Sequence, residues 1–187
     1  MPVPSSPNGF LPNETDPKKL LFYPKLVAIY DITFQFINRY LDVKDRTRDQ
    51  MLQSARSGKQ NIIEGAADGL TSSKMELSLT NCSKGSLREL QADYEDYLRA
   101  RGIPIWGQHH PRTSRLQQFC RSLTNPEQHI ATWQKMDDEE LANLALTLIH
   151  QSIYLIEHYI KMLEQRFITQ GGISEAMTQA RRNHRHF

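Results

Sequence analysis

Cysteine is scarce in this sequence: Cys82 and Cys120 are the only two among 187 residues. Two thiols are too few for a disulfide framework or a structural zinc site. The first residues, MPVPSSPNGFLPNE, lack the charged and apolar regions of a signal peptide. The sequence therefore predicts a cytoplasmic protein with free thiols. Cys82 falls on an apolar stripe and is expected to be buried and inert.

Long apolar runs are also absent. The most apolar stretch, residues 141–163, is interrupted by polar side chains such as Asn143, His150 and Glu157. A membrane-spanning helix needs about 20 predominantly apolar residues, so neither a transmembrane helix nor a membrane partner is expected. Hydrophobic residues make up 39% of the chain and charged residues 24%, which is typical of a protein that folds around one core.

The motifs that carry common enzyme chemistries are missing as well. No Gly-rich loop follows a strand pattern, which excludes the usual phosphate-binding loops. Di-metal centres in helical proteins use Glu-x-x-His pairs, whereas Glu157 and His158 are adjacent and face different directions. Histidines in loops are more often solvated than bound to a metal. We therefore expect no catalytic residue, no metal and no cofactor.

Apolar residues at three- and four-residue steps predict four long helices. With no strand pattern between them, the chain is expected to be all-α, an antiparallel up-down four-helix bundle. An insertion over residues 102–137, which contains a short helix, separates the third helix from the fourth. A basic C-terminal extension follows the bundle. The four helices are predicted over residues 24–41, 45–67, 74–101 and 137–166.

Polar residues and glycines mark the expected ends of these helices. The second is expected to begin at Asp45 or Thr47. Ser72 or Ser73 is expected to cap the third, with Glu76 at capping-box spacing from Ser73. Glycines are expected to end the third and fourth helices, at Gly102 and at Gly171-Gly172.

Three regions follow from this pattern. Residues 1–21 are rich in proline and are predicted to form an extended N-terminal arm. Residues 22–166 form the bundle with its insertion. Residues 167–187 form a C-terminal suffix that ends in a basic patch.

The second predicted helix contains several residues with low helix propensity, in the stretch SARSGKQNIIEG at residues 54–65. Ser54, Gly58, Asn61 and Gly65 follow at steps of four, three and four and therefore share one face. The third helix carries small residues in SKGSLREL, and we expect the two small faces to pack closely, with Asn61 and Glu64 hydrogen-bonding across the pair. This helix-pair motif comprises Gly58, Asn61, Glu64, Gly65, Gly85, Ser86 and Glu89.

Charge is small in total and unevenly distributed. The chain carries +2, while the segments 137–166, 102–136 and 171–187 carry −4, +3 and +2. Basic segments suit phosphate contacts with a nucleic acid, or pairing with the acidic segment of another subunit. Aromatic residues do not interleave with the arginines in the sequence, so recognition of shape and phosphates is expected rather than base stacking. The predicted nucleic-acid contacts are Arg112, Arg115, Arg121, Arg181, Arg182 and Arg185.

Two motifs resemble a known family. NIIEG, residues 61–65, resembles the Asn-(Ile/Val)-Ala-Glu-Gly signature that closes the second helix of a bacterial four-helix-bundle family. GSLREL, residues 85–90, resembles the Gly-Ser-Leu-x-Glu-Leu segment of its third helix. The family includes the proteins encoded in large-subunit rRNA intervening sequences and the accessory variability determinant proteins of diversity-generating retroelements. Residues 167–177, followed by Arg181 and Arg182, resemble its suffix-domain subgroup, whereas Ile63 and the long insertion depart from the family pattern.

The resemblance implies a non-enzymatic, self-assembling protein. It implies a homopentamer that binds nucleic acid, RNA or RNA/DNA, as an accessory subunit, with a reverse transcriptase or rRNA as candidate partners. The alternative is a purely structural oligomeric scaffold, in which the acidic end of the fourth helix meets basic segments of a neighbouring subunit. A metal-dependent enzyme, the third class, would require stoichiometric metal in the purified protein.

Overall fold

The computed structural model describes residues 16–68, 72–170 and 182, and within these ranges all regular structure is helical, which confirms the all-α prediction. No helix in the described ranges is long and apolar enough to cross a membrane. The helices are η1 (Pro17–Lys19), α1 (Tyr23–Tyr40), α2 (Thr47–Asp68), α3 (Ser73–Arg101), α4 (Thr113–Ser122), η2 (Pro126–His129), α5 (Ile130–Trp133) and α6 (Asp138–Gln170).

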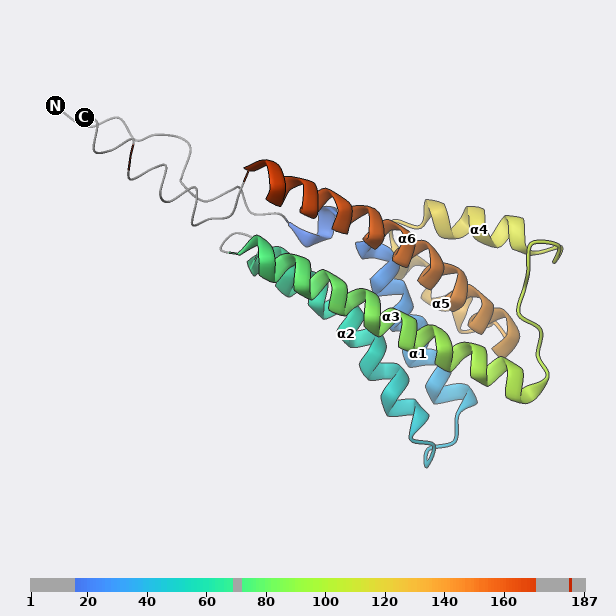
Figure 1. Cartoon of the computed structure of the whole chain (residues 1–187). Helices are drawn as coiled ribbons and strands as arrows, with labels where there is room; N and C mark the ends of the chain where they lie inside the picture. Colours follow the sequence, from blue (N-terminus) through green and yellow to red (C-terminus); the bar gives the residue numbers. More distant parts are fainter. Residues whose placement is uncertain (1–15, 69–71, 171–181, 183–187) are drawn as a thin grey trace.

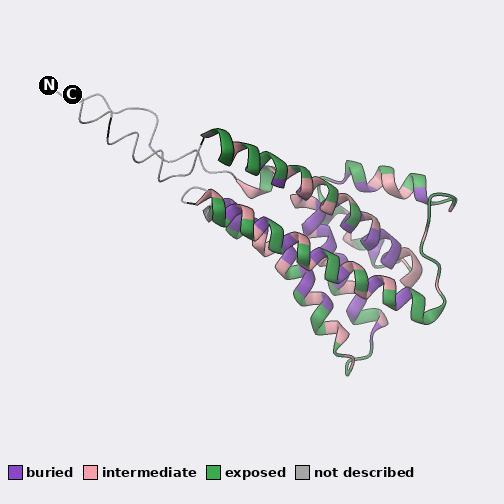
Figure 2. Cartoon of the chain, in the orientation of Figure 1, coloured by how far each residue is buried: buried purple, intermediate pink, exposed green. Residues whose placement is uncertain are grey.

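The four long helices, α1, α2, α3 and α6, lie side by side (Figure 1). α2 packs against α3, α3 against α6, α6 against α1, and α1 against α2. α3 and α6 run in opposite directions, since Glu76 near the start of α3 contacts Arg166 near the end of α6, and Tyr97 bonds Asp138 at the opposite end. Large side chains such as Phe36 fill the space between the helices, and Figure 2 shows buried residues on each of them.

The segment between α3 and α6 packs on α6 through α4 and on α1 through η2, and α5 packs on η2. Side chains of the long helices hold this segment by its backbone. The buried Lys25 ammonium of α1 donates to the carbonyl of Cys120, and the Arg39 guanidinium donates to that of Met136 at 2.7 Å. The Gln151 amide of α6 donates to another carbonyl at 3.1 Å. Carbonyls held in this way belong to Pro104, Gln117, Cys120, Trp133 and Met136.

The helix ends agree with most of the sequence expectations. The Asp45 carboxylate accepts from the Thr47 N–H, at 2.9 Å, where α2 begins. Gly102 takes a left-handed conformation, with φ 66°, at the end of α3. Ser72 is the cap of α3, since its hydroxyl accepts from the backbone N–H of the third helical residue. The capping box from Ser73 to Glu76 is therefore wrong. The predicted glycine stop at Gly171-Gly172 lies outside the described residues.

The predicted region boundaries at both termini differ from the helix ends. Within the arm predicted over residues 1–21, residues 17–19 form η1, so this part is not extended, while residues 1–15 lie outside the described residues. α6 continues to Gln170 and therefore crosses the boundary predicted between residues 166 and 167.

The prediction for Cys82 is wrong, because this thiol is exposed and Cys120 is the buried one. The face of α3 that packs inward carries Thr80, Ser83 and Leu87. Small polar residues occupy two of these buried positions, so a search for apolar residues alone indicated a neighbouring face. Burial raises the pKa of the Cys120 thiol to about 12.

Only one of the two cysteines is therefore expected to react with dithionitrobenzoate in the native protein at about pH 8, because the reagent requires an accessible thiolate. The fast phase should correspond to Cys82, and unfolding should release the second thiol. Cys82→Ser should abolish the fast phase. Two fast thiols in the native protein would contradict the burial of Cys120.

Candidate functional site

The helix-pair motif places two glycines of α2 against α3. A Cβ atom on Gly58 would lie 3.1 Å from Leu87 Cδ2, and one on Gly65 would lie 3.3 Å from Leu79 Cβ. The buried Ser83 hydroxyl donates to the Gly58 carbonyl at 2.6 Å. The small residues at 58 and 65 therefore permit a close approach of the two helices.

Serines carry the other hydrogen bonds between α2 and α3. Ser86 Oγ lies 3.1 Å from Ser57 Oγ, and the Ser54 hydroxyl donates to the Glu89 carboxylate at 3.4 Å. Ser57 was not part of the predicted motif, and the available signal was its position four residues before Asn61, next to the face that carries Gly58 and Gly65. Ser86 and Glu89 thus lie at this helix pair.

Three other members of the motif do not join the helices as predicted. The Asn61 amide donates to Ser57, one turn earlier in α2 itself, at 3.1 Å. Glu64 is exposed and makes no hydrogen bond to α3 within the described part of the chain. Gly85 is exposed, and a Cβ atom there would meet no atom within 4 Å. The cross-helix role of Asn61 and Glu64 is therefore wrong, and Gly85 has no packing role among the described residues.

The three arginines of the insertion lie on or next to α4. Arg112 precedes the helix, and its guanidinium donates to the Glu140 carboxylate at 2.7 Å and lies 5.5 Å from the Trp106 ring centroid. Arg112 therefore ties the insertion to α6, and its charge is partnered within the chain. Arg115 and Arg121 are exposed on α4 and form no ion pair with any described residue.

The C-terminal arginines cannot be related to α4 in the same way. Arg182 is helical and exposed. Arg181 and Arg185 lie outside the described residues. The structure thus brings together Arg112, Arg115 and Arg121.

α4 runs alongside α6 in the same direction. Its start is tied to the start of α6 by the Arg112–Glu140 pair, and the Gln151 amide donates to the Gln117 carbonyl further along both helices. Next to this contact, α6 exposes Tyr154, whose ring lies 4.3 Å from that of His158. Tyr154 was missed by the sequence reasoning, because 33 positions separate it from Arg121.

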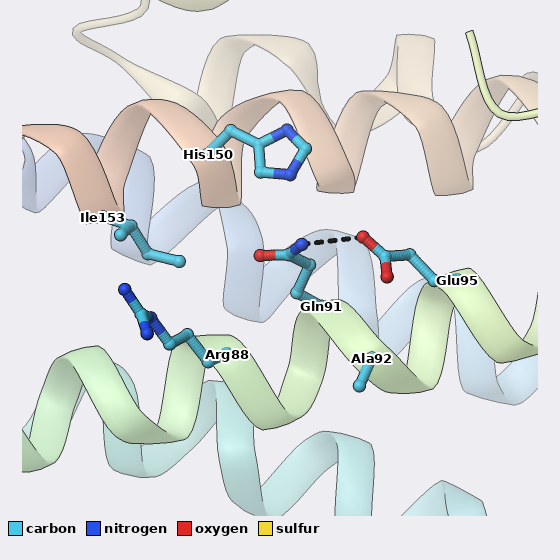
Figure 3. Close-up of a pocket in the computed structure, with 6 residues that line it drawn as sticks. All are labelled: Arg88, Gln91, Ala92, Glu95, His150 and Ile153. Atoms are coloured by element: carbon cyan, nitrogen blue, oxygen red, sulfur yellow. Dashed lines mark hydrogen bonds between the residues drawn. The ribbon is translucent and has the colours of Figure 1, made fainter. Parts of the chain in front are cut away.

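A shallow groove of about 440 Å³ lies between α3 and α6 (Figure 3). It lies on the side of Tyr154 and His158 that faces away from α4. The Gln91 amide donates to the Glu95 carboxylate at 2.7 Å, and Arg88 lies 3.2 Å from Glu157. The lining includes one carboxylate, Glu95, and the basic side chains of Arg88 and His150, and it contains no nucleophile held by a base. The groove is lined by Arg88, Gln91, Ala92, Glu95, His150 and Ile153.

A second groove, of about 540 Å³, lies between α2 and α3 and is acidic. Burial, with Asp96 and Glu89 nearby, raises the pKa of the Asp93 carboxyl. The described residues contain no group of three or more His, Cys, Asp or Glu side chains arranged to hold a metal ion. The groove is lined by Asp49, Gln50, Gln53, Ser54, Glu89 and Asp93, and its charge disfavours an anionic ligand.

Lys25 of α1 is buried where α1 meets α4. Its ammonium donates to the Cys120 carbonyl, and burial lowers the pKa of the Lys25 ammonium because desolvation disfavours its charged form. Between this lowered pKa and the ordinary value of 10.5, the unfolded chain binds more protons than the folded one. Lys25 therefore makes the free energy of unfolding rise with pH in this window.

Lys25→Met removes a buried charge, which offsets the loss of the hydrogen bond to the Cys120 carbonyl, so its stability near pH 7 is expected to lie within about 1 kcal/mol of that of the original protein. Relative to the original protein, the variant should lose stability as pH rises toward 10.5. Urea unfolding at several pH values measures this loss, with Cys120→Ser in both proteins, because Lys25 and Cys120 affect each other's pKa and the Cys120 contribution would not cancel in the difference. Lys44→Met in the exposed α1–α2 connection is the matched control and should show no such trend. A constant difference between the Lys25 variant and the original protein would contradict the lowered pKa.

Comparisons with family models, curated proteins and solved structures find no match to this chain. The resemblance at residues 61–65 and 85–90 stays a prediction from the sequence.

Proposed function

We propose that this protein is a non-enzymatic, self-assembling four-helix bundle that binds nucleic acid as an accessory subunit. α1, α2, α3 and α6 would form the antiparallel up-down bundle, with residues 102–137 inserted between α3 and α6. The all-helical structure and the packing of these four helices in neighbouring pairs support this arrangement. The resemblance at residues 61–65 and 85–90 supports a homopentamer, with rRNA or a reverse transcriptase as partner, in the bacterial cytoplasm.

One observation carries the nucleic-acid proposal: Arg115 and Arg121 project from α4, which contains no acidic residue. Both side chains are exposed and without an ion-pair partner among the described residues. Phosphate groups provide the missing negative charge, and each phosphate that is neutralised releases counterions. Affinity should therefore fall steeply as salt rises.

Fluorescence anisotropy with labelled single-stranded and duplex oligonucleotides, at salt concentrations from about 50 to 200 mM, tests this proposal. Arg115→Glu combined with Arg121→Glu should weaken binding at least tenfold while circular dichroism stays unchanged. Arg56→Glu, at an exposed position of α2, is the control and should bind normally. Absence of binding at low salt, or an affinity independent of salt, would overturn the proposal.

The structural scaffold is the second candidate, and the open acidic groove between α2 and α3 favours it. In this case basic segments of one subunit meet acidic surfaces of the next, which are the start of α6, as the sequence predicts, and this groove. The charge reversals at Arg115 and Arg121 should then lower the mass measured by light scattering from five times the 21.7 kDa chain mass. An unchanged mass together with lost nucleic-acid binding favours the first proposal.

A further inference from the structure

We propose that the α4–α6 face, defined as Arg115 and Arg121 of α4 with Tyr154, His158 and Lys161 of α6, binds single-stranded nucleic acid. Tyr154 stacks on a base while the arginines and Lys161 contact phosphates. This inference rests on the proposed function and assigns it a surface and a strand type.

The register of the two helices brings Arg121 of α4 and Tyr154 of α6 to one level, with Arg115 about 9 Å earlier along α4 and Lys161 about 10 Å later along α6. Gln117 of α4 accepts a hydrogen bond from Gln151 of α6, and the two helices run in the same direction. One further turn along each helix, about four residues, reaches Arg121 on α4 and Tyr154 on α6. Figure 1 shows α4 lying alongside α6 on the outside of the four long helices.

Tyr154 has a ring that is available to a ligand. Its side chain is 61% exposed, although tyrosine usually buries its ring against other apolar groups. Its one described aromatic neighbour is His158, tilted at 48°, whose Nδ1 lies 2.9 Å from the Tyr154 carbonyl oxygen. Such a ring on the surface offers a platform for a base.

Exposed cations without an ion-pair partner outnumber acids of that kind here, where Glu164, three residues after Lys161, is exposed and forms no ion pair with a described residue. Arg115, Arg121 and Lys161 are exposed and form no ion pair with a described residue. Two acids that flank the face are already neutralised within the chain. Glu140 pairs with Arg112, and Glu157 lies 3.2 Å from Arg88 and 3.9 Å from Lys84 on the α3 side.

A platform of this kind selects single strands. In a duplex the faces of the bases are stacked on one another, whereas unpaired bases are free to stack on an aromatic side chain. A duplex would engage only the three cations. In this proposal, base stacking on Tyr154 is added to the phosphate and shape recognition that the sequence predicts.

The test uses the full chain and fluorescein-labelled oligonucleotides: a single strand of thymidines or uridines about 20 nucleotides long, and a blunt duplex. Tyr154→Leu should weaken single-strand binding about tenfold or more, with little change for the duplex. Arg115→Gln with Arg121→Gln should reduce the slope of log affinity against log salt by about 1.4 for the single strand, at 0.7 for each phosphate contact. Phe34→Leu, at an exposed aromatic position of α1, and Arg56→Gln are the matched controls and should bind normally.

The outcomes separate this inference from the proposed function. If the original protein binds neither single strand nor duplex at low salt, the proposed function fails. If it binds, and the double arginine variant binds more weakly while Tyr154→Leu binds as tightly as the original, the stacking platform is overturned and the proposed function stands. If neither variant weakens binding, this face is not the site, and the observation on Arg115 and Arg121 that carries the proposed function fails with it. A uridine strand carrying 4-thiouridine gives a second measurement: photocrosslinks to peptides of α4 or α6 support the face, and crosslinks confined to other peptides overturn it.

Discussion

Arg166→Met is expected to lower the free energy of unfolding by about 3 kcal/mol. The Arg166 guanidinium donates to the carboxylate of Glu76, which is buried at the start of α3. Tyr159 donates its hydroxyl to the other carboxylate oxygen at 2.6 Å, and burial together with this bond raises the pKa of Tyr159, which keeps the hydroxyl protonated. Without Arg166, the buried carboxylate has lost its counter-charge.

The size of this effect follows from how far water reaches the pair. Removal of one partner from a buried ion pair costs about 3–5 kcal/mol. The Arg166 side chain is 37% exposed, while that of Glu76 is 2% exposed. Water that enters from the Arg166 side compensates part of the loss, so we expect the lower end of the range.

A double-mutant cycle monitored by urea unfolding measures the interaction. Glu76→Gln with Arg166→Met should recover most of the lost stability, because no uncompensated charge remains and the amide oxygen still accepts from Tyr159. Strictly additive losses in the two single variants and the double variant would show that the pair contributes no coupling energy.

Gly58→Leu is expected to destabilise the protein by about 2–3 kcal/mol, because it overpacks the contact between α2 and α3. Even a Cβ atom at this position would lie 3.1 Å from Leu87 Cδ2. Leu87 has no exposed surface, so its side chain has no free space into which to move. The helices must separate, and the Ser83 bond to the Gly58 carbonyl would lengthen or break.

Gly85→Leu is the matched control, since it places the same side chain at an exposed helical glycine with nothing within 4 Å. It should leave stability unchanged or raise it, and Gly85→Ala should add about 1 kcal/mol through helix propensity. Thermal and urea unfolding compare the two positions. Equal losses at positions 58 and 85 would contradict the different roles of the two glycines.

The long helices could be predicted from the sequence because the spacing of apolar residues that indicates a helix repeats every three or four positions along the chain. The packing of α3 could not, because Thr80 and Ser83 occupy buried positions that an apolar pattern assigns to other residue types. Glu76 shows the same limit. Its spacing from Ser73 suits a capping box, but Arg166, 90 positions away in the sequence, determines where its carboxylate lies. The short helices η2 and α5 carry too few residues for a period to be recognised.

The candidate site was predictable in part. Charge counting along the chain found Arg115 and Arg121, because basic residues cluster in the insertion. Charge counting also selected Arg112, although Arg112 pairs with Glu140. The count could not show this pair, because Glu140 belongs to the acidic segment 137–166 and Arg112 to the basic segment 102–136. Tyr154 belongs to the same segment as Glu140, and only the packing of α4 on α6 relates it to the arginines.

The attachment of the insertion through its backbone has a consequence for how this protein can change. The insertion accepts hydrogen bonds at its backbone carbonyl oxygens from Lys25, Arg39 and Gln151. These bonds do not depend on the side chains of the insertion, because every residue type has a backbone carbonyl. Substitutions on the outer side of α4 therefore leave these anchors in place. The outward-facing residues of α4 can therefore be substituted, or redesigned for a different ligand, without removing the hydrogen bonds that attach the insertion.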